Sequence, residues 1–418
     1  MTEPKVPAAE SVQAAQESAE PSSAKAPAKA PTKAAKAAPA KTAAKGETKA
    51  EQQPSTVGNR DAWARLATAN NSSRTIPELL KKAGIAGWTV TANPMVAVIP
   101  SGKCTECRKP VGVKHTADCL MGQELPAASG AAGKVEVEHT SIPLEVPGLW
   151  SLVKMNPQDP AKSVHIAHTN REATPVSVDV RGAILSELLK VLPGAKTGAA
   201  GPLWEGTASF ATVRVPDLVS VGKVDKVEIR AVLVNSLMPG KGSTVRVMPV
   251  HTGTHTVIPV TLPGLPDRVE LDPNNNQDSR ITEASQALDL CFRMAEEFGE
   301  VANKLLRKKM TIREFQDFAD TVLNDKPMPS AGPSQFKLYD TRTGVVEALF
   351  RGEVDLTAKI KGTRWAALLS VLAWVQNIKP TKTGGELGDR DRAMSALFPH
   401  RESLNTAQTA LNLLTADL

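Results

Sequence analysis

Aromatic side chains are scarce in this sequence. They make up 4% of its 418 residues, and Tyr339 is its single tyrosine. Proteins that hold single strands by base stacking depend on aromatic platforms, so stacking is a poor candidate for a main mode of binding. Long apolar runs are also missing, because no stretch reaches the 18 residues that suggest a membrane-spanning helix. We therefore expect no membrane partner.

Cysteine is scarce as well. The chain has four cysteines, too few for a disulfide framework at this length. Residues 1–20 contain acids and no continuous apolar run, unlike a secretory signal. Phosphate-binding loops, serine nucleophile elbows and H-E-x-x-H zinc motifs are absent. These absences favour the cytoplasm of a bacterial host cell and a protein that is not an enzyme, although they leave an unrecognised enzyme type open.

The charge balance is mildly basic. Fifty Lys and Arg residues face 44 Asp and Glu residues, giving a formal net charge of +6. Such an excess is compatible with acidic partners without requiring them. Hydrophobic residues make up 41% of the chain, enough to bury a sizeable core.

Residues 1–57 form a tail of Ala, Lys, Pro, Glu, Ser and Thr, which predicts disorder because it offers little apolar bulk to bury. Residues 21–46 carry six lysines and no acid. Each lysine that neutralises a phosphate releases counterions, so one interpretation is non-specific phosphate binding. The other is a solvated linker that keeps the protein soluble. The six lysines are Lys25, Lys29, Lys33, Lys36, Lys41 and Lys45.

Three of the cysteines cluster in the pattern C-x2-C-x7-H-x3-C, formed by Cys104, Cys107, His115 and Cys119. Zinc takes four tetrahedral ligands from thiolate sulfur and imidazole nitrogen. The pattern therefore predicts one structural Zn²⁺ in a knuckle at residues 104–119, with no open position for catalysis. A dithiol redox pair would leave the spacing of His115 and Cys119 unexplained.

Four basic residues lie within or beside the knuckle. They are compatible with phosphate contacts, as in basic zinc knuckles, and equally with electrostatic stabilisation of the thiolates. Lys379, Lys382, Arg390 and Arg392 form a second basic stretch near the C-terminus, and with the tail they predict a phosphate footprint. The four basic residues within or beside the knuckle are Lys103, Arg108, Lys109 and Lys114.

The fold class predicted from these patterns is α+β, with an antiparallel-rich sheet region followed by a helical C-terminal region. We expect a disordered tail over 1–57, an α+β region carrying the knuckle over 58–270, and helices packed on the sheet over 271–418. Valine-rich segments predict strands at 207–215, 226–235 and 244–250, with shorter strands at 88–91, 95–99 and within 134–175. Residues 194–201 read as a loop.

Helices are predicted from apolar periodicity and from capping residues. Thr75 with Glu78 and Thr311 with Glu314 have the spacing of capping boxes. Further helices are expected at 179–192, 280–309, 363–376 and 403–415. The remaining histidines that stand out, His165 with His168 and His251 with His255, are interpreted as surface or core histidines. The spacing of His251 and His255 would suit a metal on a helix, but they flank a turn and no acid lies near them in sequence.

The C-terminal third resembles a known family. The run Gly362-Thr-Arg-Trp365-Ala-Ala-Leu368 followed by Trp374-Val-Gln376 is similar to the signature of the phage/plasmid-like protein family, the domain of unknown function 932. Asp391-Arg392 and the run 395–398 resemble the family's closing segment. Asn235-Ser236, Gly242-Ser243 and 245–247 resemble its strand pair, and 84–90 its early element.

The sequence departs from that family at two places. Ser370 stands where the family has asparagine, and His251-Thr252 stands about where it has Cys-x-Asn. The knuckle and the tail look like additions. Because the family has no settled activity, the resemblance implies a mobile-element context and no particular chemistry.

Two functions from different classes follow. The first is a phage- or plasmid-encoded nucleic-acid-binding protein acting in DNA replication or recombination, of which strand annealing is one form. The alternative is a protein-interaction or assembly module, or a homo-oligomeric scaffold, without catalytic activity. Nucleic acid and a second copy of the chain are therefore the partners to consider.

Overall fold

The computed structural model of the chain describes residues 60–70, 73–101, 140–156, 159–170, 175–238, 241–273, 277–353, 359–398 and 406–418. All of them lie in one compact unit, Gln53–Leu418. The predicted tail lies outside these residues, so its disorder stays a prediction. No helix in these described ranges is long and apolar enough to cross a membrane.

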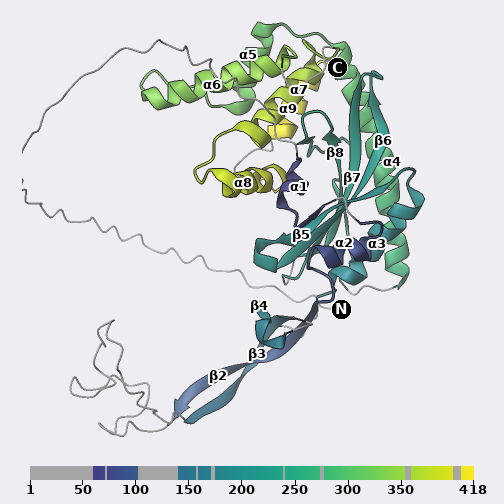
Figure 1. The fold of residues 1–418 in the computed structure, drawn as a ribbon, viewed down its shortest axis with the longest axis vertical. Helices are drawn as coiled ribbons and strands as arrows, with labels where there is room; N and C mark the ends of the chain where they lie inside the picture. Colours follow the sequence, from purple (N-terminus) through teal and green to yellow (C-terminus); the bar gives the residue numbers. More distant parts are fainter. Residues whose placement is uncertain are drawn as a thin grey trace, which may run out of the picture. The chain divides into compact units, whose positions relative to one another are not determined.

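A central antiparallel sheet forms the middle of this unit (Figure 1). Its strands follow the order β1-β5-β6-β7-β8-β10, and β9 pairs with β8. The three valine-rich predictions correspond to β6, β7 and β8 and are confirmed. The strands are β1 (Ala69–Asn70), β5 (Lys196–Leu203), β6 (Ala208–Val221), β7 (Asp225–Ser236), β8 (Thr244–His251), β9 (Thr256–Val257) and β10 (Arg268–Glu270).

The predicted loop at 194–201 is wrong, because Lys196 begins strand β5. Glycines in a strand often mark close approach of neighbouring atoms. A Cβ on Gly198 would lie 2.2 Å from Thr212 Oγ1, and a Cβ on Gly201 would lie 3.0 Å from the Thr68 nitrogen. These glycines therefore admit neighbouring atoms within a strand and do not mark a loop.

Helices cover both faces of the central sheet. Along β7, Ile229, Ala231 and Leu233 belong to a core cluster shared with α3 and α4. The alternate residues Val232 and Val234 belong to a second cluster shared with α1 and α8. This period of two is the geometry of a strand buried on both faces. The first three helices on the chain are α1 (Ala62–Leu66), α2 (Ile76–Lys82) and α3 (Val178–Val191), and α8 (Gly385–Leu397) lies near the C-terminus.

The helical C-terminal region begins with the long helix α4 (Gln277–Arg307). It continues through α5 (Ile312–Leu323), α6 (Pro333–Phe350), α7 (Arg364–Ala373) and α9 (Thr406–Thr415). A single π-helical turn, Trp374–Ile378, extends α7. Each residue of α7 from Trp365 to Ala373 is buried. The predicted α+β class is confirmed by these helices and the antiparallel sheet.

The two capping boxes differ. Thr311 Oγ1 accepts the Glu314 amide at 3.3 Å and the Glu314 carboxylate accepts the Thr311 amide at 2.7 Å, so this box is complete. At α2, Thr75 Oγ1 accepts the Glu78 amide at 3.3 Å, but the Glu78 carboxylate accepts the Arg74 amide instead. The box at α2 is therefore only half formed.

A separate three-stranded antiparallel sheet has the order β2-β3-β4. Strand β2 (Thr89–Ser101) joins the two short strands predicted there, and β3 (Thr140–Met155) and β4 (Val164–Thr169) follow. One face packs in a small cluster formed by Val90, Leu152 and Leu237. The Gly87 amide also donates to Asp179 Oδ2 at 2.8 Å, which connects the start of β2 to helix α3.

Candidate functional site

The predicted zinc ligands lie outside the described residues. Cys104, Cys107, His115 and Cys119, together with Lys109 and Lys114 and the six tail lysines, fall in ranges that the structure does not describe. The flanking strands are described, and their pairing among the described residues extends to Ser101 opposite Thr140. Within the described ranges, no group of three or more His, Cys, Asp or Glu residues could hold a metal ion. The zinc knuckle stays a prediction.

The predicted C-terminal basic residues lie around helix α8. Lys379, Lys382 and Arg390 are exposed. Arg392 is half-buried and its Nη1 donates to the carbonyl of Lys379 at 2.8 Å, while its Nη2 pairs with Asp389. Arg392 thus closes the turn between the π-helical turn and α8. The structure therefore separates one structural arginine from three exposed cations.

Arg65 on helix α1 joins this group. No sequence pattern predicts this, because 311 residues separate Arg65 from Gln376, which it contacts. Its Nη1 donates to the Gln376 carbonyl at 2.7 Å. Its Nε and Nη2, and the Nε of Arg392, are buried with no hydrogen-bond partner. Burial lowers the pKa of Arg65; Asp389 opposes this, while Arg392 and Arg60 add to it. Arg65 and Arg392 are therefore electrostatic neighbours.

An ion network fixes helix α1 and with it Arg65. Asp61 caps the helix by accepting the Ala64 amide at 3.0 Å. The same carboxylate accepts Arg230 Nη1 at 2.7 Å, and Arg230 also pairs with Glu228. Burial alone would raise the pKa of Asp61, but Arg230 and the Ala64 amide outweigh it and lower that pKa. The ionised Asp61 therefore connects α1 to strand β7.

We call the exposed residues Arg60, Lys379, Lys382 and Arg390, with Arg65 and Arg392 behind them, the basic surface. Three acids, Glu386, Asp389 and Asp391, lie on the same helix α8 and offset part of its charge. Ahead of that helix, Gly384 and Gly385 have φ values of 64° and 54°, a left-handed region that glycine adopts readily. No side chain caps the start of α8, and uncapped N-terminal amides favour anions.

A buried polar centre connects α7 to the sheet. The carboxylate of Asp225 lies 2.9 Å from His251 Nε2 and accepts Trp365 Nε1 at 2.7 Å. On the other side of the ring, His251 Nδ1 lies 2.7 Å from Thr254 Oγ1. Burial opposes ionisation of Asp225, but its bonds to His251 and Trp365 lower its pKa below the ordinary value. Asp225 therefore remains an aspartate inside the core.

The π-helical turn adds to the same attachment. Gln376 exchanges two hydrogen bonds with Val257 on β9, at 3.0 and 2.7 Å. Asn377 Nδ2 donates to the Thr254 carbonyl at 2.9 Å.

The Asp225–His251–Thr254 order resembles a proton relay, but His251 is 1% exposed and Thr254 is 0% exposed. The centre therefore holds α7 on the sheet, and His251 is a core histidine.

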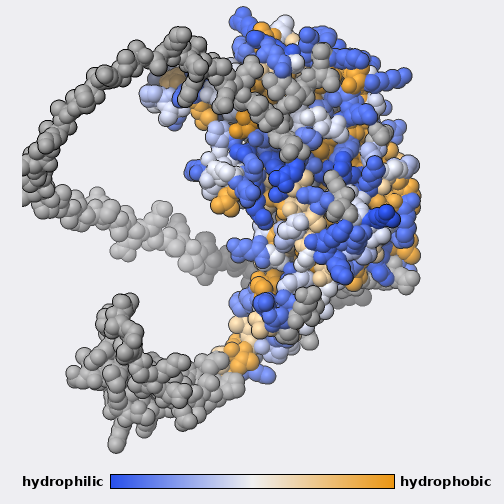
Figure 2. Space-filling model, in the orientation of Figure 1, coloured by the Kyte–Doolittle hydropathy of each residue, from blue (hydrophilic) through white to orange (hydrophobic). Residues whose placement is uncertain are grey.

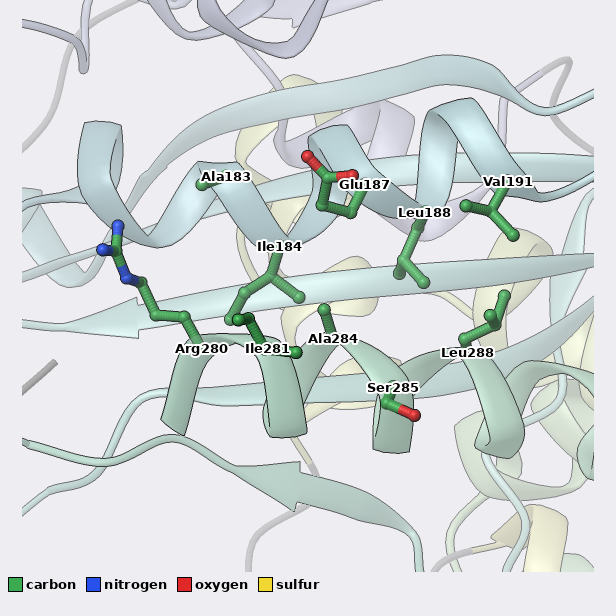
Figure 3. Close-up of a pocket in the computed structure, with 10 residues that line it drawn as sticks. All are labelled: Ala183, Ile184, Glu187, Leu188, Val191, Arg280, Ile281, Ala284, Ser285 and Leu288. Carbon is green, nitrogen blue, oxygen red and sulfur yellow. The ribbon is translucent and has the colours of Figure 1, made fainter. Parts of the chain in front are cut away.

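A groove runs between α3 and the first half of α4, as Figure 3 shows. Its volume is about 460 Å³. Val191 on α3 and Ile281 on α4 are 56% and 66% exposed, whereas Glu187 and Arg280 are its charged lining residues. Apolar side chains this exposed over a hollow are typical of a contact surface. The other apolar lining residues are Ala183, Ile184, Leu188, Ala284 and Leu288.

Comparison with known families identifies one region of similarity. Residues 268–397 match the family described as Domain of unknown function (DUF932). This stretch runs from β10 to the end of α8. It contains Trp365, which donates to Asp225 in the buried polar centre, and Gln376 of the π-helical turn. No curated protein and no solved structure matches the chain. The resemblance noted in the sequence is thus confirmed for this stretch as a similarity to a domain of unknown function.

Proposed function

We propose that this chain is a phage- or plasmid-encoded protein that binds nucleic acid in DNA replication or recombination, with strand annealing as one form of that activity. The observation that carries the proposal is the basic surface around α8. Lys379, Lys382 and Arg390 are exposed on α8 and the segment before it, and Arg392 contacts the Lys379 carbonyl. The buried Nε groups of Arg65 and Arg392 have no partner. Guanidinium and ammonium groups are the usual ligands of phosphate oxygens.

Contacts to the phosphate backbone would dominate this binding. Aromatic residues make up only 4% of the chain. Trp63, Trp365 and Trp374 are buried in the core, and the exposed Trp204, Phe292 and Phe336 are scattered over three different elements. Base stacking is therefore a minor contribution. The acids on α8 reduce the net charge, so the basic surface alone would bind weakly and with strong salt dependence.

Two further sequence features support the proposal. The six tail lysines add sequence-independent phosphate contacts. In our proposal one structural zinc ion is bound by Cys104, Cys107, His115 and Cys119. Lys109 and Lys114 lie beside these ligands in the sequence. The similarity of residues 268–397 to DUF932 supports the mobile-element context through the resemblance described above.

A salt-dependent binding measurement tests the function. Fluorescence anisotropy with single- and double-stranded DNA compares the full chain with a variant lacking residues 1–57. In the shortened background, a triple variant replaces Lys379, Lys382 and Arg390 with alanine. Because each lost phosphate contact removes counterion release, affinity at low salt should fall about tenfold to hundredfold. The slope against salt should also become shallower, by about 0.7 for each lost contact to a single strand.

A matched control removes the same charge elsewhere. Lys81, Lys196 and Lys337 are exposed and lie on α2, β5 and α6, so their triple alanine variant should bind DNA like the parent. If both triple variants weaken binding equally, net charge explains the effect and the basic surface is not the site. No binding by the full chain at low salt would exclude the proposed function, since electrostatic binding is strongest there.

The apolar groove favours the alternative function, a protein-interaction or assembly module. Val191 and Ile281 expose more than half of their surface over it. Light scattering coupled to size exclusion decides between the two. A defined oligomer that dissociates when Ile281 is replaced by lysine, in a chain without DNA affinity, would favour the module. A monomer with salt-dependent DNA binding would favour the first proposal.

A further inference from the structure

Two exposed histidines on strand β4 lie in direct contact. His165 Nε2 is 3.3 Å from His168 Nδ1, and the ring centroids are 4.4 Å apart. Residues three apart on a regular strand face opposite sides of the sheet, because side chains alternate. The pairing of these two rings therefore needs a local departure from regular strand geometry.

A β-bulge supplies that departure. His168 lies opposite Ser151 and Ala167 opposite Leu152, but the next residue of β3, Val153, lies opposite His165. Ile166 is thus the extra residue on β4. Because Ser151 and Val153 are two apart on β3, the two histidines opposite them share one face of the sheet. Bulges commonly re-aim a side chain at functional positions.

The face that carries the pair is open and mostly polar, with Val153 between Thr91 and His165. Thr91 and Asn93 on β2 lie in the same rows as the two histidines, through Val153 and Ser151. The opposite face contributes Val90 and Leu152 to the small apolar cluster. Both histidines are exposed. The extra residue Ile166 packs against this cluster, and the same bulge leaves both imidazole rings side by side on the exposed face.

We propose that His165 and His168 form a two-histidine site for a divalent transition-metal ion, with water completing the coordination. Two imidazole nitrogens bound to a tetrahedral ion at 2.0–2.1 Å are separated by about 3.3–3.4 Å, and the two ring nitrogens here are 3.3 Å apart. The last side-chain torsion of histidine is broad, so small rotations aim both lone pairs at one ion.

The ligand set defines the class of ion. Neutral imidazoles suit Zn²⁺, Ni²⁺ and Cu²⁺, whereas Mg²⁺ and Ca²⁺ require oxygen ligands. No third His, Cys, Asp or Glu completes the site among the described residues. The site is therefore an exchangeable one, unlike the closed four-ligand knuckle proposed for the cysteine cluster, and it does not depend on the proposed nucleic-acid binding.

Nickel is a suitable probe. Tag-free full-length protein is first saturated with Zn²⁺, which soft thiolates retain, and is then equilibrated with Ni²⁺ in dialysis. The wild type should take up one additional ion that His165→Ala and His168→Ala each bind about 10²-fold more weakly, because a lone imidazole loses the advantage of two linked ligands. Both side chains are exposed, so neither variant should change the melting temperature.

His255→Asn is the matched control. His255 has φ of 51°, which asparagine tolerates, and this variant removes one imidazole away from β4. It should bind nickel like the wild type. Equal nickel uptake by the wild type and both alanine variants would overturn the proposal, as would a zinc-saturated wild type that takes up none, since an ordinary hydrogen-bonded histidine pair predicts that result.

Discussion

Trp365 donates its indole N–H to Asp225 Oδ2 at 2.7 Å, which connects the second residue of helix α7 to the first residue of strand β7. Both partners are buried, and the acceptor carboxylate also faces His251. The most specific part of the family-like signature thus contributes a hydrogen-bond donor to the core, in addition to apolar bulk.

Replacing Trp365 with phenylalanine should lower the free energy of unfolding by about 1–3 kcal/mol beyond the loss of volume, because Asp225 loses a buried donor. Trp374→Phe is the control, since Trp374 is 1% exposed and its Nε1 already has no partner. Urea unfolding followed by circular dichroism measures both. Equal losses in the two variants would show that the Trp365–Asp225 bond contributes nothing.

The pairing of Asp61 with Arg230 predicts a pH dependence. The pKa of Asp61 in the folded chain lies below its ordinary value of 3.8. A lowered folded pKa means that the stabilisation is complete above the unfolded pKa and is lost as pH falls through the folded value. Stability should therefore decline below about pH 4. Asp61→Asn should reduce stability at pH 7 by about 3 kcal/mol, since it leaves Arg230 without one of its two partners.

Urea unfolding between pH 3 and 7 checks this prediction. The Asp61→Asn curve should be flatter than the wild-type curve in the acid range, because the group that titrates there is gone. Parallel curves would mean that other carboxylates control the acid response. Glu228 also pairs with Arg230, so Glu228→Gln tests whether the network acts as one unit.

Cys291 should be unreactive in the folded chain. It is 0% exposed on helix α4, and burial raises the pKa of its thiol to about 12. About one molecule in 10⁴ would carry the thiolate at pH 8. In a background with the other three cysteines replaced by serine, iodoacetamide should label Cys291 only after urea is added, as read by mass spectrometry. Rapid labelling without urea would contradict the buried position.

The cysteine cluster predicts a metal content. The purified full chain should carry about one zinc ion, and Cys119→Ala should lose it, because a tetrahedral site needs all four ligands. Plasma mass spectrometry measures the metal. The core should keep its melting temperature in this variant, since β2 and β3 pair from Thr89 to Ser101 without the cluster. A wild-type chain without zinc would remove the knuckle from the proposal.

Local signals in the sequence predicted many elements correctly. Thr311 and Glu314 mark the start of α5 because a capping box joins two residues only three positions apart. The valine-rich strands β6 to β8 and the apolar helix α7 follow from periodicity alone. The loop predicted at 194–201 is wrong, because Gly198 lies in a strand and makes room for Thr212, a contact that no local pattern indicates.

Long-range pairs account for what could not be predicted. Asp225 lies 26 residues from His251 and 140 residues from Trp365. Sequence reasoning found no acid near His251 and therefore no partner for it. Arg65 was missed for the same reason, since its neighbours are on α8. Among the candidate basic residues, Arg392 donates to the Lys379 carbonyl and so stabilises a turn. An arginine in the sequence does not show whether it will make such an internal contact.

The ladder between β2 and β3 has a consequence for how this protein can vary. The last pair among the described residues joins Ser101 to Thr140, so the two described strand ends lie directly opposite each other. A two-residue hairpin turn can close such a pair, and the entropy of closing a loop grows only slowly with its length. The described pairs between β2 and β3 therefore place few limits on the length of the cysteine-bearing segment that joins them.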